Sequence, residues 1–206
     1  MVSDVHEILS VIIYTATDGR KLAPNRDLGH KMVCLSVEKP PKPWKWIKLP
    51  TPYEDPVLNA KVPKILPWLF FDFDECLWVD ANVEIKSLPK FTGDISIHTH
   101  SQRDCIFDEA QACIDLKKDD PEKINRYIMQ HQEFPKHAGL WECTIIYRKN
   151  TPEIKKLCED WWNEIINGTR RDQISLPVVL KNNNVVPTSL GPNMRKSKWF
   201  KLHKKS

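Results

Sequence analysis

Residues 76–79 form a short, continuous apolar run (Cys-Leu-Trp-Val) that stops at Asp80-Ala81-Asn82. A run of this kind predicts a strand buried inside a sheet. A buried strand that ends on hard oxygen ligands is typical of α/β enzymes that hold a divalent cation at the carboxyl edge of the sheet. The segment therefore predicts an α/β fold with a candidate site at Asp80.

Further strands and helices follow from the pattern along the chain. Apolar or alternating runs predict strands over residues 10–16, 32–37, 44–49, 94–100, 141–147 and 184–187. Helical spacing predicts helices over residues 58–71, 104–116, 121–132, 151–166 and 171–180. Strands that alternate with helices imply an α/β sandwich with a central, mostly parallel sheet. We expect one domain over residues 1–206.

Prolines and capping residues fix several of these boundaries. Pro67 limits the helix over residues 58–71 to two or three turns. Thr151 is the expected N-cap of the longest helix, with Pro152 at its first position. Asp119 or Asp120 is expected to cap the helix over residues 121–132.

The composition excludes several classes of protein. Of the 206 residues, 41% are hydrophobic and 28% charged, and no apolar run is long enough to span a membrane. The first ten residues lack the basic region of a signal peptide, so we expect a cytoplasmic protein. The six cysteines are scattered without a Cys-x-x-Cys pair, which favours reduced thiols over disulfides or a zinc site.

The net charge of +4 is unevenly distributed, because basic residues gather in a tail over about residues 193–206. This segment is either a solvated tail or a clamp over phosphates or an acidic polymer. The rest of the chain is balanced and has no aromatic-rich basic repeat, so we expect no nucleic-acid partner.

The Asp80-x-Asn82 step is the first candidate site. Mg²⁺ or Mn²⁺ is commonly bound by one or two carboxylates together with substrate phosphate oxygens. Asn82 is a neutral and weaker ligand, so a nucleotide would complete such a site. A turn or a helix cap is the alternative, but the position after the most apolar strand favours the metal.

The His98-x-His100 pair is the second candidate. It would place both imidazoles on one face of a strand, a geometry that zinc hydrolases use. No third ligand stands at a recognisable spacing, so a polar strand face is favoured. A metal-dependent hydrolase built on His98, His100 and Asp104 remains an alternative, as does a carbohydrate- or nucleotide-binding domain without turnover.

Carboxylates and tryptophans supply the remaining candidates. Glu142 lies at the start of a strand, and Asp172 and Gln173 at the start of a helix. Asp172 and Gln173 would bind sugar hydroxyls if they point into a cleft, although acidic residues are also favoured in a first helical turn. Tryptophans can stack on sugars, but the helical spacing of Trp161 predicts a core position.

Taken in order, the segments of this chain resemble a glycosyltransferase of the GT-A fold, close in pattern to glycosyltransferase family 8. More specifically, the chain resembles a glycosyltransferase-like family of plants, bacteria and large DNA viruses, including the chlorella-virus type of domain. The matching segments lie at residues 14–16, 60–67, 77–82, 100–110, 139–142, 170–177 and 193–195.

The resemblance implies a Rossmann-like αβα sandwich. It also implies an enzyme that transfers a hexose or deoxyhexose from a UDP-sugar to a glycan or glycoprotein acceptor, with retention of configuration. It implies Mn²⁺ or Mg²⁺ held by Asp80, Asn82 and His203. It implies donor contacts from Tyr14, Thr15, Ala16, Lys61, Asp80, Ala81, Gln173 and Arg195. The carboxylate that stabilises the oxocarbenium-like sugar would be Asp172 or Glu142.

Overall fold

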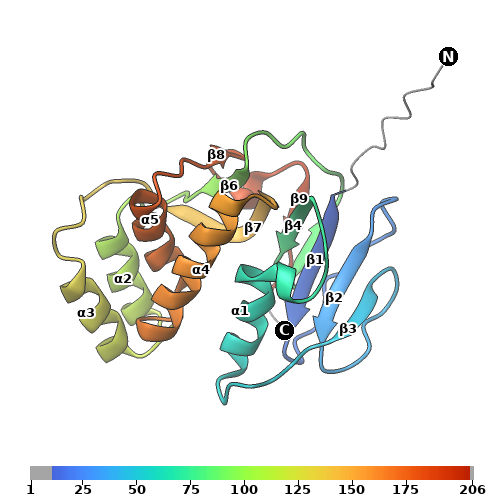
Figure 1. Cartoon of the computed structure of the whole chain (residues 1–206), viewed down its shortest axis with the longest axis horizontal. Helices are drawn as coiled ribbons and strands as arrows, with labels where there is room; N and C mark the ends of the chain where they lie inside the picture. The colour runs from blue at the N-terminus through green and yellow to red at the C-terminus, as the bar shows by residue number, and fades with distance from the viewer. Residues whose placement is uncertain (1–10, 205–206) are drawn as a thin grey trace.

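The computed structural model describes residues 11–204, and a seven-stranded sheet forms its centre (Figure 1). The strands lie in the order β3-β2-β1-β4-β7-β6-β8. Strand β7 runs antiparallel to β4 and β6, whereas the other neighbouring pairs are parallel. The expected α/β class with a mostly parallel sheet is therefore confirmed. The strands are β1 (Ile12–Thr17), β2 (Met32–Ser36), β3 (Lys45–Lys48), β4 (Glu75–Val79), β6 (Ile95–Thr99), β7 (Trp141–Lys149) and β8 (Thr188–Ser189).

Helices begin where the sequence provides caps. Thr151 Oγ1 accepts a hydrogen bond from Ile154 N at the start of the longest helix, and Asp120 is the cap of the third helix. The helix expected over residues 58–71 ends at Ile65, and Pro67 begins a separate 3₁₀ turn because proline has no amide proton for the helical ladder. The helices are α1 (Pro56–Ile65), η1 (Pro67–Leu69), α2 (Ile106–Asp115), α3 (Pro121–Gln130), α4 (Pro152–Asn167), α5 (Asp172–Asn182) and η2 (Met194–Lys196).

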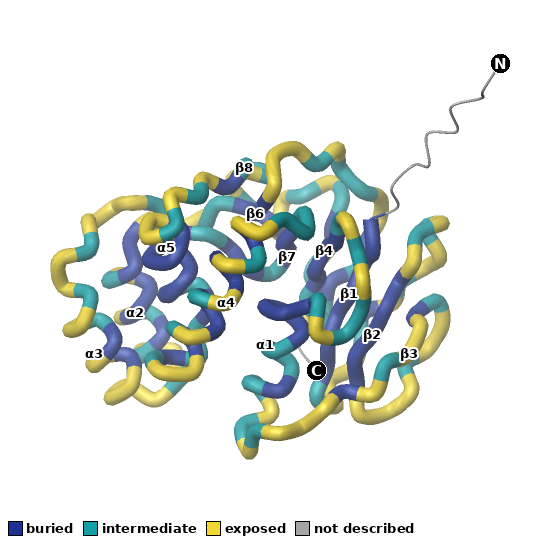
Figure 2. The backbone as a smooth tube through the Cα atoms, viewed as in Figure 1, coloured by how far each residue is buried: buried dark blue, intermediate teal, exposed yellow. Residues whose placement is uncertain are grey.

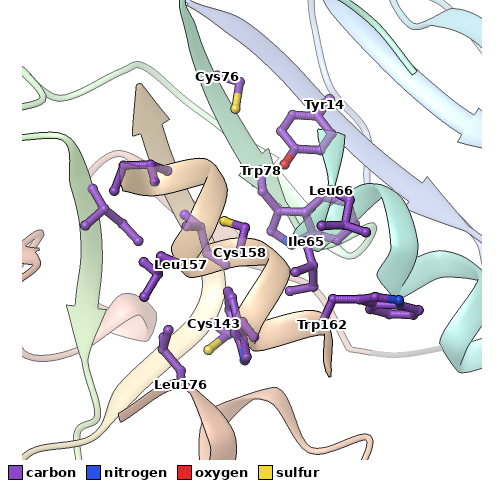
Figure 3. Packing of buried hydrophobic residues seen from close by; sticks show 14 of the residues in the cluster. Tyr14, Ile65, Leu66, Cys76, Trp78, Cys143, Leu157, Cys158, Trp162 and Leu176 are labelled. Carbon is purple, nitrogen blue, oxygen red and sulfur yellow. The ribbon is translucent and has the colours of Figure 1, made fainter. Parts of the chain in front are cut away.

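One face of the sheet is covered by α1, α4 and α5, which lie in front of the strands in Figure 1. The strands beneath these helices are almost continuously buried (Figure 2). Figure 3 shows Tyr14, Trp78 and Leu157 in this apolar layer. Trp161 is fully buried and its indole N–H donates to Ser175 Oγ at 3.0 Å, which confirms its expected core position. Helices α2 and α3 pack against α5 in a smaller cluster.

The opposite face is covered by a second, two-stranded sheet of β5 (Val83–Ile85) and β9 (Phe200–Leu202), together with η2 and loops. The central sheet is thus flanked by α1, α4 and α5 on one side and by the β5–β9 sheet with η2 on the other. Short segments with apolar side chains, such as Met194 and Phe200, bury this face without a full helix.

The C-terminal segment is therefore not a solvated tail over residues 193–204, because Met194 and Phe200 anchor it in the core between its basic residues. The strand expected over residues 184–187 is also misplaced. Asn184 has a positive φ of 54° and turns the chain after α5, so the strand forms at Thr188–Ser189 instead.

All six cysteines are buried and free, as expected. None of the helices formed by residues 11–204 combines the length and the apolar character needed to cross a membrane.

Candidate functional site

A cavity of about 240 Å³ opens at the edge of the sheet where β1 and β4 end. Because the two strands are parallel, their carboxyl ends meet at this edge, and the antiparallel β7 brings its first residues to the same place. The Asp80 amide donates to Thr144 O at 3.0 Å and fixes the loop after β4 against β7. Helix α1 and the start of α5 complete the wall.

Two lysines and one aspartate form the floor of this cavity. Lys61 and Lys64 stand three residues apart on one side of α1, and Asp172 is the first residue of α5. The Nζ atoms of Lys61 and Lys64 lie 2.8 and 2.7 Å from Asp172 Oδ2. All three side chains are at most 10% exposed. The three charges are thus buried together, with two cations for one anion.

The ionisation of this trio follows from its geometry. Burial alone would raise the pKa of Asp172, but Lys61, Lys64 and Arg171 hold it well below its usual range. Burial would likewise lower the pKa of Lys64, but Asp172 and Asp80 raise it above the ordinary value. For Lys61 burial dominates and lowers the pKa. Asp172 is therefore a carboxylate throughout the physiological range.

Two side chains hold the Asp80 carboxylate at the carboxyl end of β4. Trp78 Nε1 donates to Asp80 Oδ1 at 2.9 Å, and Lys64 Nζ lies 3.3 Å from the same oxygen. The side chain is 32% exposed and lines the cavity. No described residue donates a hydrogen bond to Oδ2. Asp80 therefore presents one carboxylate oxygen to the cavity while the other is fixed by the protein.

Asn82 and His203 are joined through their backbones and one side chain. His203 N donates to Asn82 O at 2.9 Å, and Asn82 Nδ2 donates to His203 O at 2.9 Å. The His203 ring itself contacts Glu84, with Nε2 2.7 Å from Oε2. The structure thus brings the backbone of His203 beside Asn82, although His203 does not itself line the cavity, and no described residue donates a hydrogen bond to the amide oxygen of Asn82.

The predicted donor residues divide into two groups. The cavity is lined by Ala16, Lys61, Asp80, Ala81, Asn82, Asp172 and Gln173. Tyr14 and Thr15 do not line it, because β1 is covered on both faces and their fully buried side chains point into the two core layers. The Tyr14 hydroxyl donates to Lys64 O at 3.2 Å. Arg195 is exposed on η2, outside the cavity.

Glu142 lies apart from Asp172, the other catalytic candidate. Cys143 lines the cavity, so its neighbour Glu142 points to the other face of β7. There the Glu142 carboxylate accepts hydrogen bonds from Ser101 Oγ and Met194 N, both at 3.2 Å. The structure does not bring Glu142 to the cavity.

His98 and His100, the histidines of the alternative hydrolase site, form hydrogen bonds with different partners. His98 Nδ1 donates to Gly191 O at 3.1 Å, whereas His100 Nδ1 accepts from Arg103 N at 3.0 Å. A register shift in the sheet separates Ile97 from His98. Among the described residues, the group of three potential ligand atoms within 4.8 Å of one another is Asp104, Asp108 and His137, all exposed. The two strand histidines take no part in it.

Several lining residues were not singled out from the sequence. The cavity has six basic lining residues (Arg20, Lys21, Lys61, Lys64, Arg171, Lys204) and three acidic ones (Asp18, Asp80, Asp172). Lys64 is the most important addition, because it links Asp80 to Asp172. Its three-residue spacing from Lys61 on a predicted helix was the available signal. Lys204 shows that the basic C-terminal segment does reach the cavity.

The family model described as TOD1/MUCI70, glycosyltransferase-like domain, matches residues 38–201. The chain belongs to this family. Membership in the TOD1/MUCI70 family confirms the general resemblance to glycosyltransferases, while the likeness to family 8 and to the viral type stays a prediction.

Comparison with curated proteins gave no match. Among solved structures, the apo structure of the WbbM bifunctional glycosyltransferase is similar at 9% identity and a TM-score of 0.44. The similarity covers 94% of the present chain but only 40% of WbbM, so this member of the TOD1/MUCI70 family spans less than half of that protein.

Proposed function

We propose that this chain is a metal-dependent glycosyltransferase that moves a hexose or deoxyhexose from a UDP-sugar to a glycan or glycoprotein acceptor, with retention. The observation that carries the proposal is the buried trio of Lys61, Lys64 and Asp172. Family membership supports the reaction class, and the trio supports the kind of donor.

The trio favours an anionic ligand on physical grounds. The two buried ammonium groups share the buried Asp172 carboxylate, and the second acid that contacts Lys64, Asp80, is 32% exposed. A diphosphate that enters the cavity would add negative charge beside these lysines and accept charge-assisted hydrogen bonds from them. The surplus of basic side chains around the opening would attract the same ligand. A nucleoside diphosphate sugar carries such a group next to its reactive carbon.

Asp80 and Asn82 are suited to hold the divalent cation. Both line the cavity, and each has an oxygen that no described residue engages by a hydrogen bond. Oxygen donors of this type are those that Mg²⁺ and Mn²⁺ prefer. The bound ion would stabilise negative charge on the diphosphate as it departs.

The remaining steps fall to residues of the cavity floor. Lys61 and Lys64 would donate hydrogen bonds to the departing diphosphate, where charge builds up in the transition state. Asp172 stays ionised because of these lysines and would stabilise the positive charge that develops on the sugar ring. Gln173, the next residue of α5, would hold sugar hydroxyls.

The test is the thermal stability of the protein with UDP, GDP, UDP-glucose and GDP-mannose, each with and without Mn²⁺. A ligand that binds only the folded state raises stability by about 2.7 kcal/mol at a hundredfold excess over its dissociation constant. We expect a shift with UDP and UDP-glucose that requires Mn²⁺. No shift with any combination would contradict the proposal.

A further inference from the structure

We propose that Glu84 is a positioning residue that orients the His203 imidazole, so that its Nδ1 atom serves as the third ligand of the divalent cation. The inference rests on the proposed function, since it concerns the cation of the same site. It assigns a role to a residue that lies outside the cavity and on neither α1 nor α5.

The β5–β9 sheet creates the arrangement. Val83 pairs with Leu202 and Glu84 with Lys201 in antiparallel register. Continued by one residue, the same register places His203 opposite Asn82, where the two exchange the backbone and side-chain hydrogen bonds described above. The sheet therefore fixes a segment from the end of the chain against the loop after β4.

Glu84 then determines which nitrogen of the ring is free. A carboxylate can only accept, so the 2.7 Å contact between Glu84 Oε2 and His203 Nε2 places the ring proton on Nε2. The neutral ring keeps a lone pair on Nδ1, for which the described residues offer no hydrogen-bond partner. Histidines that bind metals usually donate their other N–H group to a carboxylate or carbonyl in this way.

The same segment also orients the second candidate ligand. Asn82 Nδ2 donates to the His203 carbonyl, and this contact decides which end of the amide is occupied. The oxygen of Asn82 is the end that remains for a cation. Hydrogen bonds thus orient both expected ligands: Asn82 through the His203 carbonyl, and the His203 ring through Glu84.

Mn²⁺ affinity, measured by electron paramagnetic resonance, tests this role in the full chain. Loss of such an orienting partner typically weakens metal binding about 10- to 100-fold. We expect this loss for Glu84→Ala and at least as large a loss for His203→Ala. Glu84→Gln keeps an oxygen acceptor and should retain most of the affinity. Glu164→Ala is the matched control, because Glu164 on α4 pairs in the same way with a histidine, His131 at the end of α3, at 3.7 Å and should not affect Mn²⁺ binding.

A second readout separates orientation from folding. The ¹⁵N chemical shifts of the His203 ring report which of its nitrogens carries the proton. We expect the Nε2–H form of His203 in the wild type and a mixture in Glu84→Ala, with unchanged backbone signals in β5 and β9.

Two results would overturn the role of Glu84. The first is wild-type Mn²⁺ affinity in Glu84→Ala or in His203→Ala, and the second is an unchanged tautomer in Glu84→Ala. Either result leaves the proposed donor site intact if UDP still binds with Mn²⁺. A wild-type protein that binds no Mn²⁺ would instead overturn both proposals.

Discussion

The ammonium group of Lys64 joins Asp80 to Asp172: its Nζ lies 3.3 Å from Asp80 Oδ1 and 2.7 Å from Asp172 Oδ2. Asp80 follows strand β4 and Asp172 begins helix α5, so Lys64 links α1 to both of these elements of the cavity wall. Lys64 itself is fixed through its backbone, because its carbonyl accepts hydrogen bonds from Tyr14 and Arg148.

Lys64→Met should destabilise the protein, because it leaves Asp80 without its cation and Asp172 with Lys61 alone. Removing one partner of a buried ion pair costs about 3–5 kcal/mol, and we expect the lower end because Lys61 remains. Chemical denaturation measures the effect. Lys156→Met, which removes an exposed pair with Asp160, is the control and should change the stability by less than about 0.5 kcal/mol. Equal effects of the two substitutions would argue against a buried trio.

Asp172→Asn should separate binding from turnover. The substitution removes the carboxylate that both lysines contact, so UDP should bind at least as tightly as in the wild type. Release of UDP from a UDP-sugar should fall on the order of 100-fold, as is typical when one transition-state stabiliser is removed. Calorimetry gives the binding and a coupled assay the rate. Full activity in this variant would show that Asp172 is not the stabilising carboxylate.

Tyr14→Phe should lower stability and leave donor binding unchanged. The Tyr14 hydroxyl is buried and satisfies the Lys64 carbonyl, so its loss should cost about 1–3 kcal/mol. UDP affinity should stay at the wild-type value because Tyr14 lies beneath the cavity. Tyr53→Phe is the control, since no described residue bonds the Tyr53 hydroxyl. A large loss of UDP affinity in Tyr14→Phe would instead support the direct contact between Tyr14 and the nucleotide that the resemblance implies.

Stability should fall as the pH decreases from about 7.5 to 5.5. Burial is the main cause that lowers the pKa of His98 in the folded state, and His98 Nδ1 already donates to Gly191. The unfolded chain, with a histidine pKa of about 6.5, therefore takes up protons first. This proton uptake by the unfolded chain favours unfolding below about pH 6.5. His98→Gln should flatten the pH dependence of the unfolding free energy. Equal slopes in variant and wild type would contradict this role.

The sequence predicted those elements whose signal is local. Continuous apolar runs located β1, β2 and β4, and Thr151-Pro152 marked the start of α4. The same reasoning missed β5 and β9, because each has three residues and pairs with a partner more than 110 positions away. Lysines around Phe200 also masked the apolar character of β9.

Only some of the site residues could be predicted from the sequence, again because non-local contacts decide the rest. Asp80, Asn82, Lys61 and Asp172 stand out as single residues in motifs and do line the cavity. Tyr14 and Glu142 stand in equally suggestive positions but point away from it. Side-chain direction along a strand depends on what covers each face, and the second face is covered by non-local segments that give no periodic signal.

Calorimetric titration of UDP and of uridine, both with Mn²⁺, measures directly whether the buried trio binds a diphosphate. If the excess cation of the buried trio binds the diphosphate, UDP should bind at least about tenfold more tightly than uridine, as one charge-assisted hydrogen bond would provide. Lys61→Met leaves Lys64 as the one lysine that contacts Asp172, with Asp80 as its second acidic partner, and should remove most of that difference. Equal affinities for UDP and uridine in the wild type, or an unchanged preference for UDP in Lys61→Met, would show that the trio does not bind the diphosphate.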